Sequence, residues 1–257
     1  KRDQLPYGDH STQRPKKSYE EFLGLCSHEY FHAWLVKRIQ AKAFQPYRLN
    51  ERNHTRLLWL FEGFTSYYDD LQLVRSGCIT MERYLELVGN NWNGVLRNPG
   101  RTKQSVADSS FDAWTKYYQM DENTPNAVVS YYAKGSLLAL ALDLKIREHT
   151  KQKQSLDDVM RHLWQMYQLT EIGMAEDDFD HAIEFVIGSG FKATWQQIKV
   201  TGGGIKRLFK RIQARLFNLL FMYPDIQTMF LVKNALKKEK SKYDLMISIA
   251  APHPVHW

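Results

Sequence analysis

Apolar side chains recur at helical spacing along most of the first 190 residues. Between residues 19 and 40 they stand three or four positions apart, without proline and without an interior run of β-branched residues, which predicts a long helix. The same pattern predicts further helices over residues 56–75, 79–96, 127–149, 155–167 and 176–186. The alternation of apolar and polar residues that indicates strands does not appear before residue 190. The chain is therefore predicted to be mainly α-helical.

Three stretches fall outside these predicted helices. Residues 1–18 contain two prolines and are expected to form an extended lead-in. Residues 41–54 contain another proline and are rich in asparagine and arginine, so we expect a loop there. Residues 97–126 are polar, carry scattered aromatic side chains and lack periodicity of their own. We expect them to form a long irregular connection, of the kind that often covers a functional site.

The composition is that of a globular protein, and the charge is unevenly distributed. Hydrophobic residues make up 44% of the 257 residues and aromatic residues 13%, which suffices for a packed core. The net charge is +7, but residues 201–257 hold ten Lys and Arg against three acids, so residues 1–200 are balanced with 25 of each sign. The basic excess therefore concerns the last quarter of the chain. No phosphate-binding loop and no nucleic-acid-binding signature is present, and we expect no nucleic-acid partner.

Residues 205–223 form a basic amphipathic segment. Such a segment can make a weak contact with a membrane surface or with a partner helix. The alternatives are a helix packed on the domain with a solvated face, or a tail replaced through truncation or a shifted reading frame.

The chain has neither a predicted membrane span nor a disulfide framework. Its longest uninterrupted apolar stretches fall far short of the roughly 20 residues that a transmembrane helix needs, and no secretion signal is recognisable. Cys26 and Cys78 are too few for a disulfide framework and lack the spacing of a metal site. They are expected to be reduced thiols, which favours a cytoplasmic location.

The first predicted helix contains the motif His-Glu-x-x-His at residues 28–32. Residues four apart lie above one another on a helix face, so the imidazoles of His28 and His32 can reach one zinc ion. Glu29 projects beside the metal, where it can act as general base toward water whose pKa the ion lowers to about 7. The alternative is a pair of helix histidines whose nitrogens bond to solvent or carbonyl groups.

A third ligand is expected from the second predicted helix. Glu62 stands among apolar residues, where an unpaired carboxylate would be costly. A catalytic zinc site needs a third protein ligand, and Glu62 can supply it. The alternative is an ion pair with Arg38 or Arg56. Asp69 follows on the same helix face and is a candidate acceptor for the N–H of a ligand histidine, with a solvated carboxylate as the alternative.

A series of further motifs stands in order along residues 18–185. They are FLGLCSHEYFHAW at 22–34, VKRI at 36–39, FEGFTSYY at 61–68, GR at 100–101 with QSV at 104–106, SFDAW at 110–114, ENTPN at 122–126, VSYYAKG at 129–135 and SLDDVM at 155–160. Together they resemble the glycyl aminopeptidase family of zinc peptidases, which belongs to the gluzincins.

The resemblance implies a helical, thermolysin-like gluzincin lobe that binds one zinc ion. It implies His28, His32 and Glu62 as metal ligands and Glu29 as the catalytic base. Tyr132, in the Tyr-x-Lys-Gly part of its motif, matches the tyrosine that in related aminopeptidases donates a hydrogen bond to the tetrahedral oxyanion. Without the family, an aromatic side chain packed on a helix face is the alternative for this residue. The implied activity is removal of small N-terminal residues, glycine or alanine, from peptides.

The sequence also departs from the family. The resemblance implies a layout of three domains, with a β-rich domain before the catalytic domain and a PDZ-like domain after it. Relative to this layout, we expect this chain to be truncated at both ends. The Gly-Gly-Leu-Glu-His element that binds the substrate amine in relatives is absent. We expect a lead-in over residues 1–18, a catalytic domain over 19–188, and a divergent C-terminal segment over 189–257 that is irregular or a basic helix. The alternative function is a zinc-binding but catalytically inactive remnant.

Overall fold

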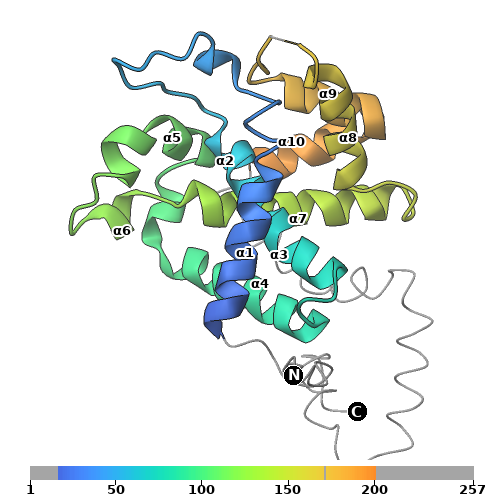
Figure 1. The fold of residues 1–257 in the computed structure, drawn as a ribbon, viewed down its shortest axis with the longest axis horizontal. Coiled ribbons are helices and arrows are strands. Elements are labelled where there is room, and N and C mark those ends of the chain that lie inside the picture. Colours follow the sequence, from blue (N-terminus) through green and yellow to red (C-terminus); the bar gives the residue numbers. More distant parts are fainter. Residues whose placement is uncertain (1–16, 171, 201–257) are drawn as a thin grey trace, which may run out of the picture. The chain divides into compact units, whose positions relative to one another are not determined.

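The computed structural model describes residues 17–170 and 172–200 (Figure 1). The predicted mainly helical fold is confirmed, and the described residues contain no β-strand, only two isolated bridges. The α-helices are α1 (Lys17–Phe31), α2 (Leu58–Phe61), α3 (Gly63–Arg75), α4 (Met81–Arg97), α5 (Val106–Phe111), α6 (Thr124–Ala127), α7 (Tyr131–His149), α8 (Leu156–Tyr167), α9 (Asp178–Ile187) and α10 (Lys192–Val200). Shorter helical turns are η1 (Lys42–Phe44), η2 (Pro99–Thr102), the π-helix η3 (Ala113–Tyr117) and η4 (Ser189–Phe191).

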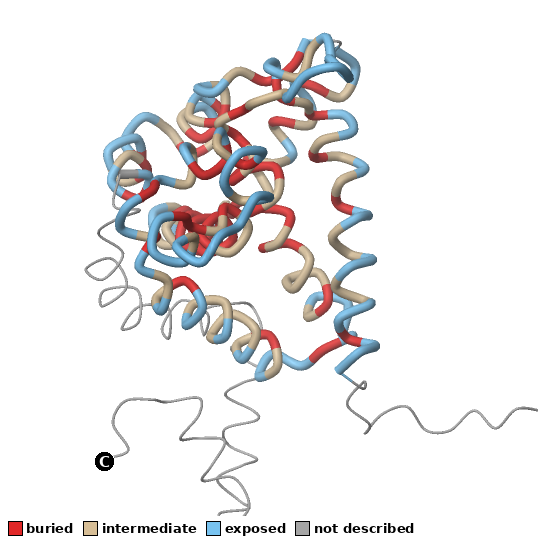
Figure 2. The backbone as a smooth tube through the Cα atoms, turned by 90° about the vertical axis from the view of Figure 1, so that its left-hand side faces the viewer, coloured by how far each residue is buried: buried red, intermediate tan, exposed pale blue. Residues whose placement is uncertain are grey.

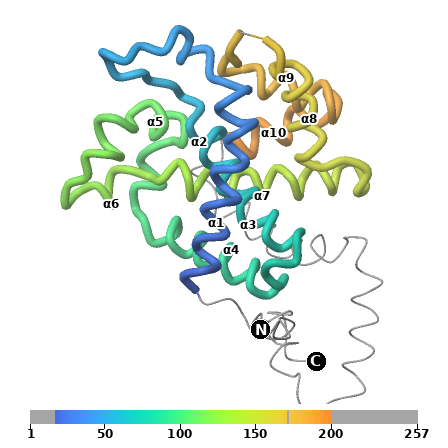
Figure 3. Tube along the Cα trace, in the orientation of Figure 1, coloured from blue at the N-terminus to red at the C-terminus, as the bar shows by residue number. Residues whose placement is uncertain are grey.

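The chain divides into two compact units. The first runs to residue 139 and includes residues 164–176, and the second comprises residues 140–163 and the chain from 177 onward. Helices α7 and α8, whose course along the chain Figure 3 shows, each contribute residues to both units. The domain boundaries expected at residues 18 and 188 stay predictions. The basic segment 205–223 lies outside the described residues, and of the expected C-terminal segment only η4 and α10 are described.

The core of the first unit forms around α2, α3 and the beginning of α7. Leu60, Phe61 and Phe64 are fully buried, as is Tyr131 at the start of α7. Helix α1 packs on α3, and Figure 2 shows α1 at its right-hand edge as mostly exposed or half-buried turns. Helix α1 is also joined to α4, because the guanidinium of Arg83 donates to both carboxylate oxygens of the buried Glu20, at 2.7 to 2.9 Å.

The first helix is shorter than its apolar pattern predicts. It ends at Phe31, whereas the sequence predicted a helix to residue 40. The chain then turns, with Val36 at φ 107° and its N–H donating to the carbonyl of Ile39. Leu35 and Ile39 form an isolated bridge and are both buried. Their four-residue spacing is that of a helix face, but they lie in a non-helical turn of the chain.

The predicted second helix is divided at a single residue. Helix α2 ends at Phe61 and α3 begins at Gly63, so Glu62 forms the junction. The backbone bonds continue across it, because the N–H of Glu62 donates to Leu58 at 2.7 Å and its carbonyl accepts from Ser66 at 2.8 Å. Thr80 caps the start of α4, since its hydroxyl accepts from the N–H of Arg83.

The prediction of an irregular connection over residues 97–126 is wrong, because this stretch is partly helical. The stretch contains η2, α5, η3 and α6, each only four to six residues long. Such short elements show too few turns for a periodic pattern to reveal them. Long-range side-chain bonds hold them in place: Ser110 accepts from the N–H of Trp59 at 2.9 Å, and Ser109 donates to the carbonyl of Val129.

Helices α3 and α7 touch through two glycines. A Cβ atom added to Gly63 would lie 2.6 Å from the Cα of Gly135, and one added to Gly135 would lie 2.5 Å from the carbonyl oxygen of Trp59. Both distances are shorter than a carbon side chain tolerates, and the opposing atoms belong to the backbone. Only glycine lets the two helices approach this closely, and Glu62 and Tyr132 lie one and three residues from the contact.

We expect Gly135→Ala to destabilise the fold by about 3 kcal/mol, because overpacking a fixed backbone contact costs roughly this much. Gly89→Ala is the matched control, since a Cβ there meets nothing within 4 Å on α4. That control is expected to stabilise by up to about 1 kcal/mol through helix propensity. Urea unfolding of both variants measures the difference, and equal stabilities would contradict the close contact.

Lys134 anchors the start of α7 from inside the protein. Its side chain is 1% exposed. Its ammonium group donates to the carbonyl oxygen of Arg101 at 3.0 Å and to the carbonyl oxygen of Gln104 at 3.5 Å. Burial, with a smaller effect from the charge of Arg101, lowers the pKa of Lys134 from 10.5 to about 8.

This lowered pKa predicts a pH dependence of stability. Between pH 8 and 10.5 the unfolded chain binds a proton on Lys134 that the folded chain releases, so the free energy of unfolding rises with pH there. Across this pH range the shifted pKa of Lys134 changes the free energy of unfolding by about 3 kcal/mol. Urea unfolding at pH 7.5 and 10 should show this rise in the wild type relative to Lys134→Met. A difference between the two proteins that is independent of pH would contradict it.

The second unit has its own polar contacts at the ends of its helices. Asp143 on α7 accepts from the N–H of Leu156 at 2.7 Å and from Arg147 at 2.9 Å, which fixes the start of α8. Asp180 on α9 accepts from the indole N–H of Trp195 at 2.7 Å, which joins α9 to α10. No predicted functional residue lies in this unit.

One helical stretch in the described part of the chain has the length and apolarity of a membrane span. It is Thr124–His149, and 78% of its most apolar window is buried within the protein. The core helix of a folded domain passes the same test, so this stretch is weak evidence of a span.

Candidate metal centre

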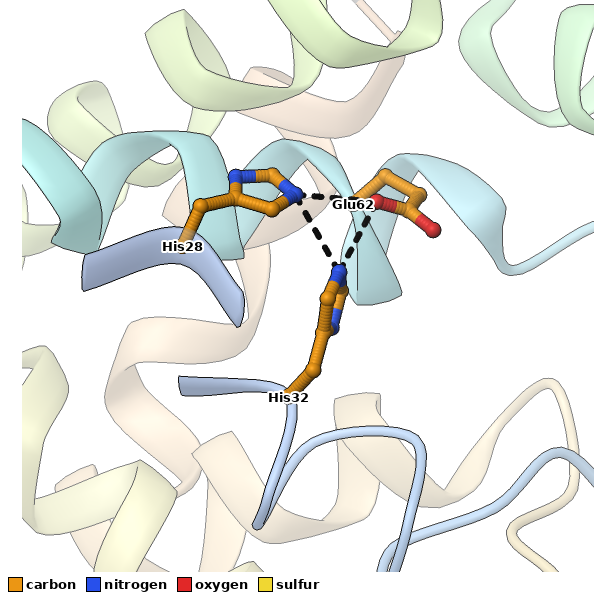
Figure 4. Close-up of side chains that lie close together, drawn as sticks. All are labelled: His28, His32 and Glu62. Atoms are coloured by element: carbon orange, nitrogen blue, oxygen red, sulfur yellow. Dashed lines mark hydrogen bonds and ion pairs between the residues drawn. The ribbon is translucent and has the colours of Figure 1, made fainter. Parts of the chain in front are cut away.

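Helix α1 and the junction between α2 and α3 bring three predicted ligands together. His28 lies in the last turn of α1, and Glu62 lies at the junction of α2 and α3. His32 follows the end of α1 by one residue, so the prediction that both histidines lie within the helix is wrong by that residue. Its N–H still donates to the carbonyl of His28 at 3.2 Å, which keeps both rings on one side of the turn. Figure 4 shows the three side chains pointing toward one another.

The three facing atoms form a nearly equilateral triangle. The Nε2 atoms of His28 and His32 are 3.1 Å apart and lie 3.3 and 3.2 Å from Oε2 of Glu62. Ligands of a tetrahedral zinc ion at 2.0–2.1 Å would be about 3.3–3.4 Å from each other. The spacing of the side chains therefore fits a common metal ion without a change of the backbone.

The hydrogen bonds on the far side of each ring fix its chemistry. Nδ1 of His32 donates to the carbonyl of Leu35 at 3.0 Å, and Nδ1 of His28 donates to Oδ2 of Asp69 at 3.0 Å. In a neutral imidazole the other nitrogen then carries a lone pair. Two such nitrogens and a carboxylate oxygen face one another, which is a set of three acceptors that a cation would satisfy.

The electrostatics of the site also favour a positive charge. Burial opposes a charge on His28, but its bonds to Asp69 and Glu62 outweigh burial and raise its pKa to about 9. Burial likewise favours the neutral form of Glu62, yet its bonds to His28 and His32 lower its pKa to about 2. In the metal-free protein a proton supplies the positive charge, and a metal ion would replace it.

Glu62 and Asp69 both contact histidine side chains, which decides between the two interpretations that the sequence left open for each. Glu62 contacts the two histidines, whereas Arg56, one of its suggested partners, pairs with Asp108 at 2.6 Å. Arg38, the other suggested partner, is exposed. Asp69 is not a solvated carboxylate, because it is largely buried and bonded to His28. The predicted contact of Asp69 with a histidine N–H is present.

Glu29 follows His28 in the sequence, and Tyr132 lies near His28 in space. Glu29 is exposed on α1 next to His28 in sequence. The ring of Tyr132, at the start of α7, is half-buried and centred 6.4 Å from the imidazole of His28. Burial, the bond to Tyr118 and the nearby charge of Glu62 all raise the pKa of Tyr132, so its phenol stays protonated. Their roles as catalytic base and hydrogen-bond donor stay predictions.

Two neighbours of Tyr132 were not predicted from the sequence. The hydroxyl of Tyr118 lies 3.3 Å from that of Tyr132, and Tyr131 also reaches Tyr118. No spacing in the sequence links Tyr118 to α7, although Tyr131 stands beside Tyr132 in the quoted motif.

We expect Asp69→Asn to weaken metal binding by about 10- to 100-fold, because loss of a ligand's hydrogen-bond partner has this effect in other metal sites. The amide no longer offers a charged acceptor to Nδ1 of His28. Asp70→Asn is a matched control, since its carboxyl is the next in sequence and does not contact His28. Competition with a chromophoric zinc chelator measures both affinities, and equal losses in the two variants would contradict the role of Asp69.

Comparison with known proteins finds a family whose sequence model matches the segment that contains these residues. The sequence model of a family described as M61 glycyl aminopeptidase matches residues 21–138. This segment belongs to the glycyl aminopeptidase family. The match includes all the predicted site residues, namely His28, Glu29, His32, Glu62 and Tyr132. The resemblance inferred from the motifs is thereby confirmed.

A solved structure agrees with the family. The chain is similar to the crystal structure of an aminopeptidase N family protein from Idiomarina loihiensis, with 43% sequence identity and a TM-score of 0.70. The similarity covers 74% of this chain and 32% of that chain, so this chain spans about a third of its length. A search of curated proteins found no match.

Proposed function

We propose that this chain is a zinc-dependent aminopeptidase that removes small N-terminal residues, glycine or alanine, from peptides. The observation that carries the proposal is the triangle of His28, His32 and Glu62, which fits a metal ion and lies within the glycyl aminopeptidase segment. Two histidines and one glutamate are a known ligand set of catalytic zinc in peptidases.

In this proposal His28, His32 and Glu62 hold one zinc ion through Nε2, Nε2 and Oε2. The ion, when bound, lowers the pKa of water to about 7 and polarises the peptide carbonyl. Asp69 and the carbonyl of Leu35 orient the imidazoles from behind and keep their Nε2 lone pairs directed at the metal.

Two further residues act on the substrate. The carboxylate of Glu29, beside His28 on the exposed side of α1, accepts a proton from the attacking water and delivers it to the leaving amine. The phenol of Tyr132 donates a hydrogen bond to the oxygen that becomes negative in the transition state. Its raised pKa supports this role, because the proton stays on the phenol at neutral pH.

The preference for N-terminal residues comes from the family and not from a residue of this site. The sequence has no Gly-Gly-Leu-Glu-His element to receive the substrate amine. A chain that binds zinc without turnover, because the substrate is not oriented, is the alternative function that the sequence left open.

Hydrolysis assays on the purified full chain test the proposal. We expect one zinc ion per chain by mass spectrometry, hydrolysis of glycyl and alanyl amides, and no cleavage of an N-acetylated peptide. A zinc chelator should stop hydrolysis, and added zinc should restore it. Absence of stoichiometric metal after incubation with zinc would refute the proposal. Bound zinc without hydrolysis would favour the inactive alternative, and cleavage of the acetylated peptide would indicate an endopeptidase.

A further inference from the structure

Two exposed aromatic rings continue from Tyr132 away from the candidate metal centre. The ring of Tyr132 is centred 6.4 Å from the imidazole of His28, and its hydroxyl oxygen lies 3.3 Å from that of Tyr118. The ring of Trp114 is centred 6.3 Å from the ring of Tyr118. His28, Tyr132, Tyr118 and Trp114 thus form an aromatic row that begins at a proposed metal ligand. The row is the same whichever of the two tyrosine hydroxyls donates to the other.

The two outer rings of the aromatic row are accessible to solvent. Tyr118 is 60% exposed and Trp114 is 43% exposed. Phe111, three residues before Trp114, is also partly exposed, but the guanidinium of Arg56 lies over its ring, 5.0 Å from the centroid. Exposed apolar surface that gathers in one place often marks a binding site. The accessible surface of the aromatic row is therefore that of Tyr118 and Trp114.

Polar contacts hold both of these rings in place. The hydroxyl of Tyr118 lies 3.2 Å from that of Tyr131 and 3.3 Å from that of Tyr132. The indole N–H of Trp114 donates to the carbonyl of Asn53 at 3.1 Å. Since the protein already bonds their polar atoms, both side chains lose little freedom when a ligand packs on them. They are ordered before a ligand arrives.

The aromatic row extends too far from the metal centre for a small first residue of a substrate to reach its outer end. An extended peptide spans about 3.5 Å per residue, and in the proposed function one glycine or alanine precedes the scissile bond. Tyr132 and Tyr118 both stand between His28 and Trp114 in the row. The part of the peptide that follows the scissile bond is long enough to reach Trp114.

We propose that Tyr118 and Trp114 form a subsite for the side chain of the second residue of the peptide, and that this subsite favours an aromatic side chain. The inference rests on the proposed function and names a substrate preference within it. Aromatic rings attract one another in offset or edge-to-face arrangements, with centroids about 4.5–7 Å apart. The preferred substrates would then carry a small first residue and an aromatic second residue.

The test compares pairs of substrates on the same protein sample. The ratio of kcat/KM for Gly-Phe amide and Gly-Ala amide does not depend on how much of the sample is folded or loaded with zinc. We expect the wild type to prefer Gly-Phe amide about tenfold, the effect of packing one aromatic side chain on a ring. Trp114→Ala should lose most of this preference. The ratio for Ala-Ala amide and Gly-Ala amide, which reports on the first residue, should not change.

Two further variants are controls. Trp114→Phe keeps a ring but lacks the indole N–H that bonds to Asn53, and it should keep most of the preference. Phe185→Ala removes a ring that is 76% exposed on α9, outside the aromatic row, and it should keep the wild-type ratio. If Trp114→Phe lost the preference as fully as Trp114→Ala, the bond to Asn53 and not the ring would carry the effect, and the inference would be overturned.

Binding of phosphinate analogues gives a second measurement that needs no turnover. Analogues of the Gly-Phe and Gly-Ala dipeptides are titrated by calorimetry into the zinc-loaded full chain. The wild type should bind the phenylalanine analogue about tenfold more tightly, and Trp114→Ala should lose most of this difference. Equal binding of the two analogues by the wild type, or an unchanged difference in Trp114→Ala, would overturn the inference. So would failure of the wild type to bind either analogue.

The outcomes separate the subsite from the proposed function. If the wild type hydrolyses both amides equally and binds both phosphinates equally, the subsite is wrong and the proposed function stands. If the wild type hydrolyses neither amide but binds the phenylalanine phosphinate more tightly, and Trp114→Ala does not, the proposed function is wrong and the subsite stands.

Discussion

Glu29→Gln is expected to lower kcat for a glycyl amide by about 10³-fold, because positioned general bases contribute roughly 10²- to 10⁴-fold to catalysis. The amide cannot accept the proton that the carboxylate takes. Glu29 is exposed and lies outside the triangle of His28, His32 and Glu62, so the variant should bind zinc as tightly as the wild type. Initial rates with zinc content determined on the same sample measure the effect.

Glu21→Gln is the control for this substitution. Glu21 is another exposed acid on α1, paired with Lys17 at 3.7 Å on the solvent side. Its variant should keep the wild-type rate. If Glu29→Gln retained most of the activity, or lost its zinc together with its activity, Glu29 would not be a base that acts beside the metal.

Glu62→Gln is expected to weaken zinc binding by more than about 100-fold, a larger effect than loss of a hydrogen-bond partner behind a ligand. The charged oxygen that completes the triangle is replaced by a neutral amide, and the two imidazoles alone leave the ion with only two protein ligands. Because Glu62 helps to raise the pKa of His28, the variant should also hold a proton on His28 less strongly.

Zinc affinity from chelator competition checks the metal loss, and the NMR titration of His28 in the metal-free protein checks the pKa. Glu51→Gln is a suitable control, since Glu51 is an exposed carboxylate paired with Arg48 at 2.7 Å. If Glu62→Gln bound zinc as tightly as the wild type, Glu62 would not be a metal ligand.

The sequence predicted the parts of the site that follow from local geometry. His28 and His32 are one helical turn apart, and this spacing brings their Nε2 atoms to 3.1 Å. Glu62 was inferred from the cost of a lone carboxylate among apolar residues, and its carboxylate meets both histidines. The contact of Asp69 with His28 followed from its place on the same helix face as Glu62.

Contacts between distant segments could not be predicted in this way. Tyr118 reaches Tyr132 because short helical turns fold residues 97–126 onto the start of α7, and elements of four to six residues leave no periodic trace in the sequence. The end of α1 was missed for a related reason. Leu35 and Ile39 keep helical spacing in a non-helical turn, so the pattern of buried positions does not distinguish a helix from this turn.

The contact between Gly63 and Gly135 links a proposed metal ligand to a proposed proton donor. Glu62 precedes one glycine and Tyr132 lies three residues before the other, so the distance between them is set by backbone atoms that lack intervening side chains. An engineer who varies the residues around this site should therefore leave these two glycines unchanged.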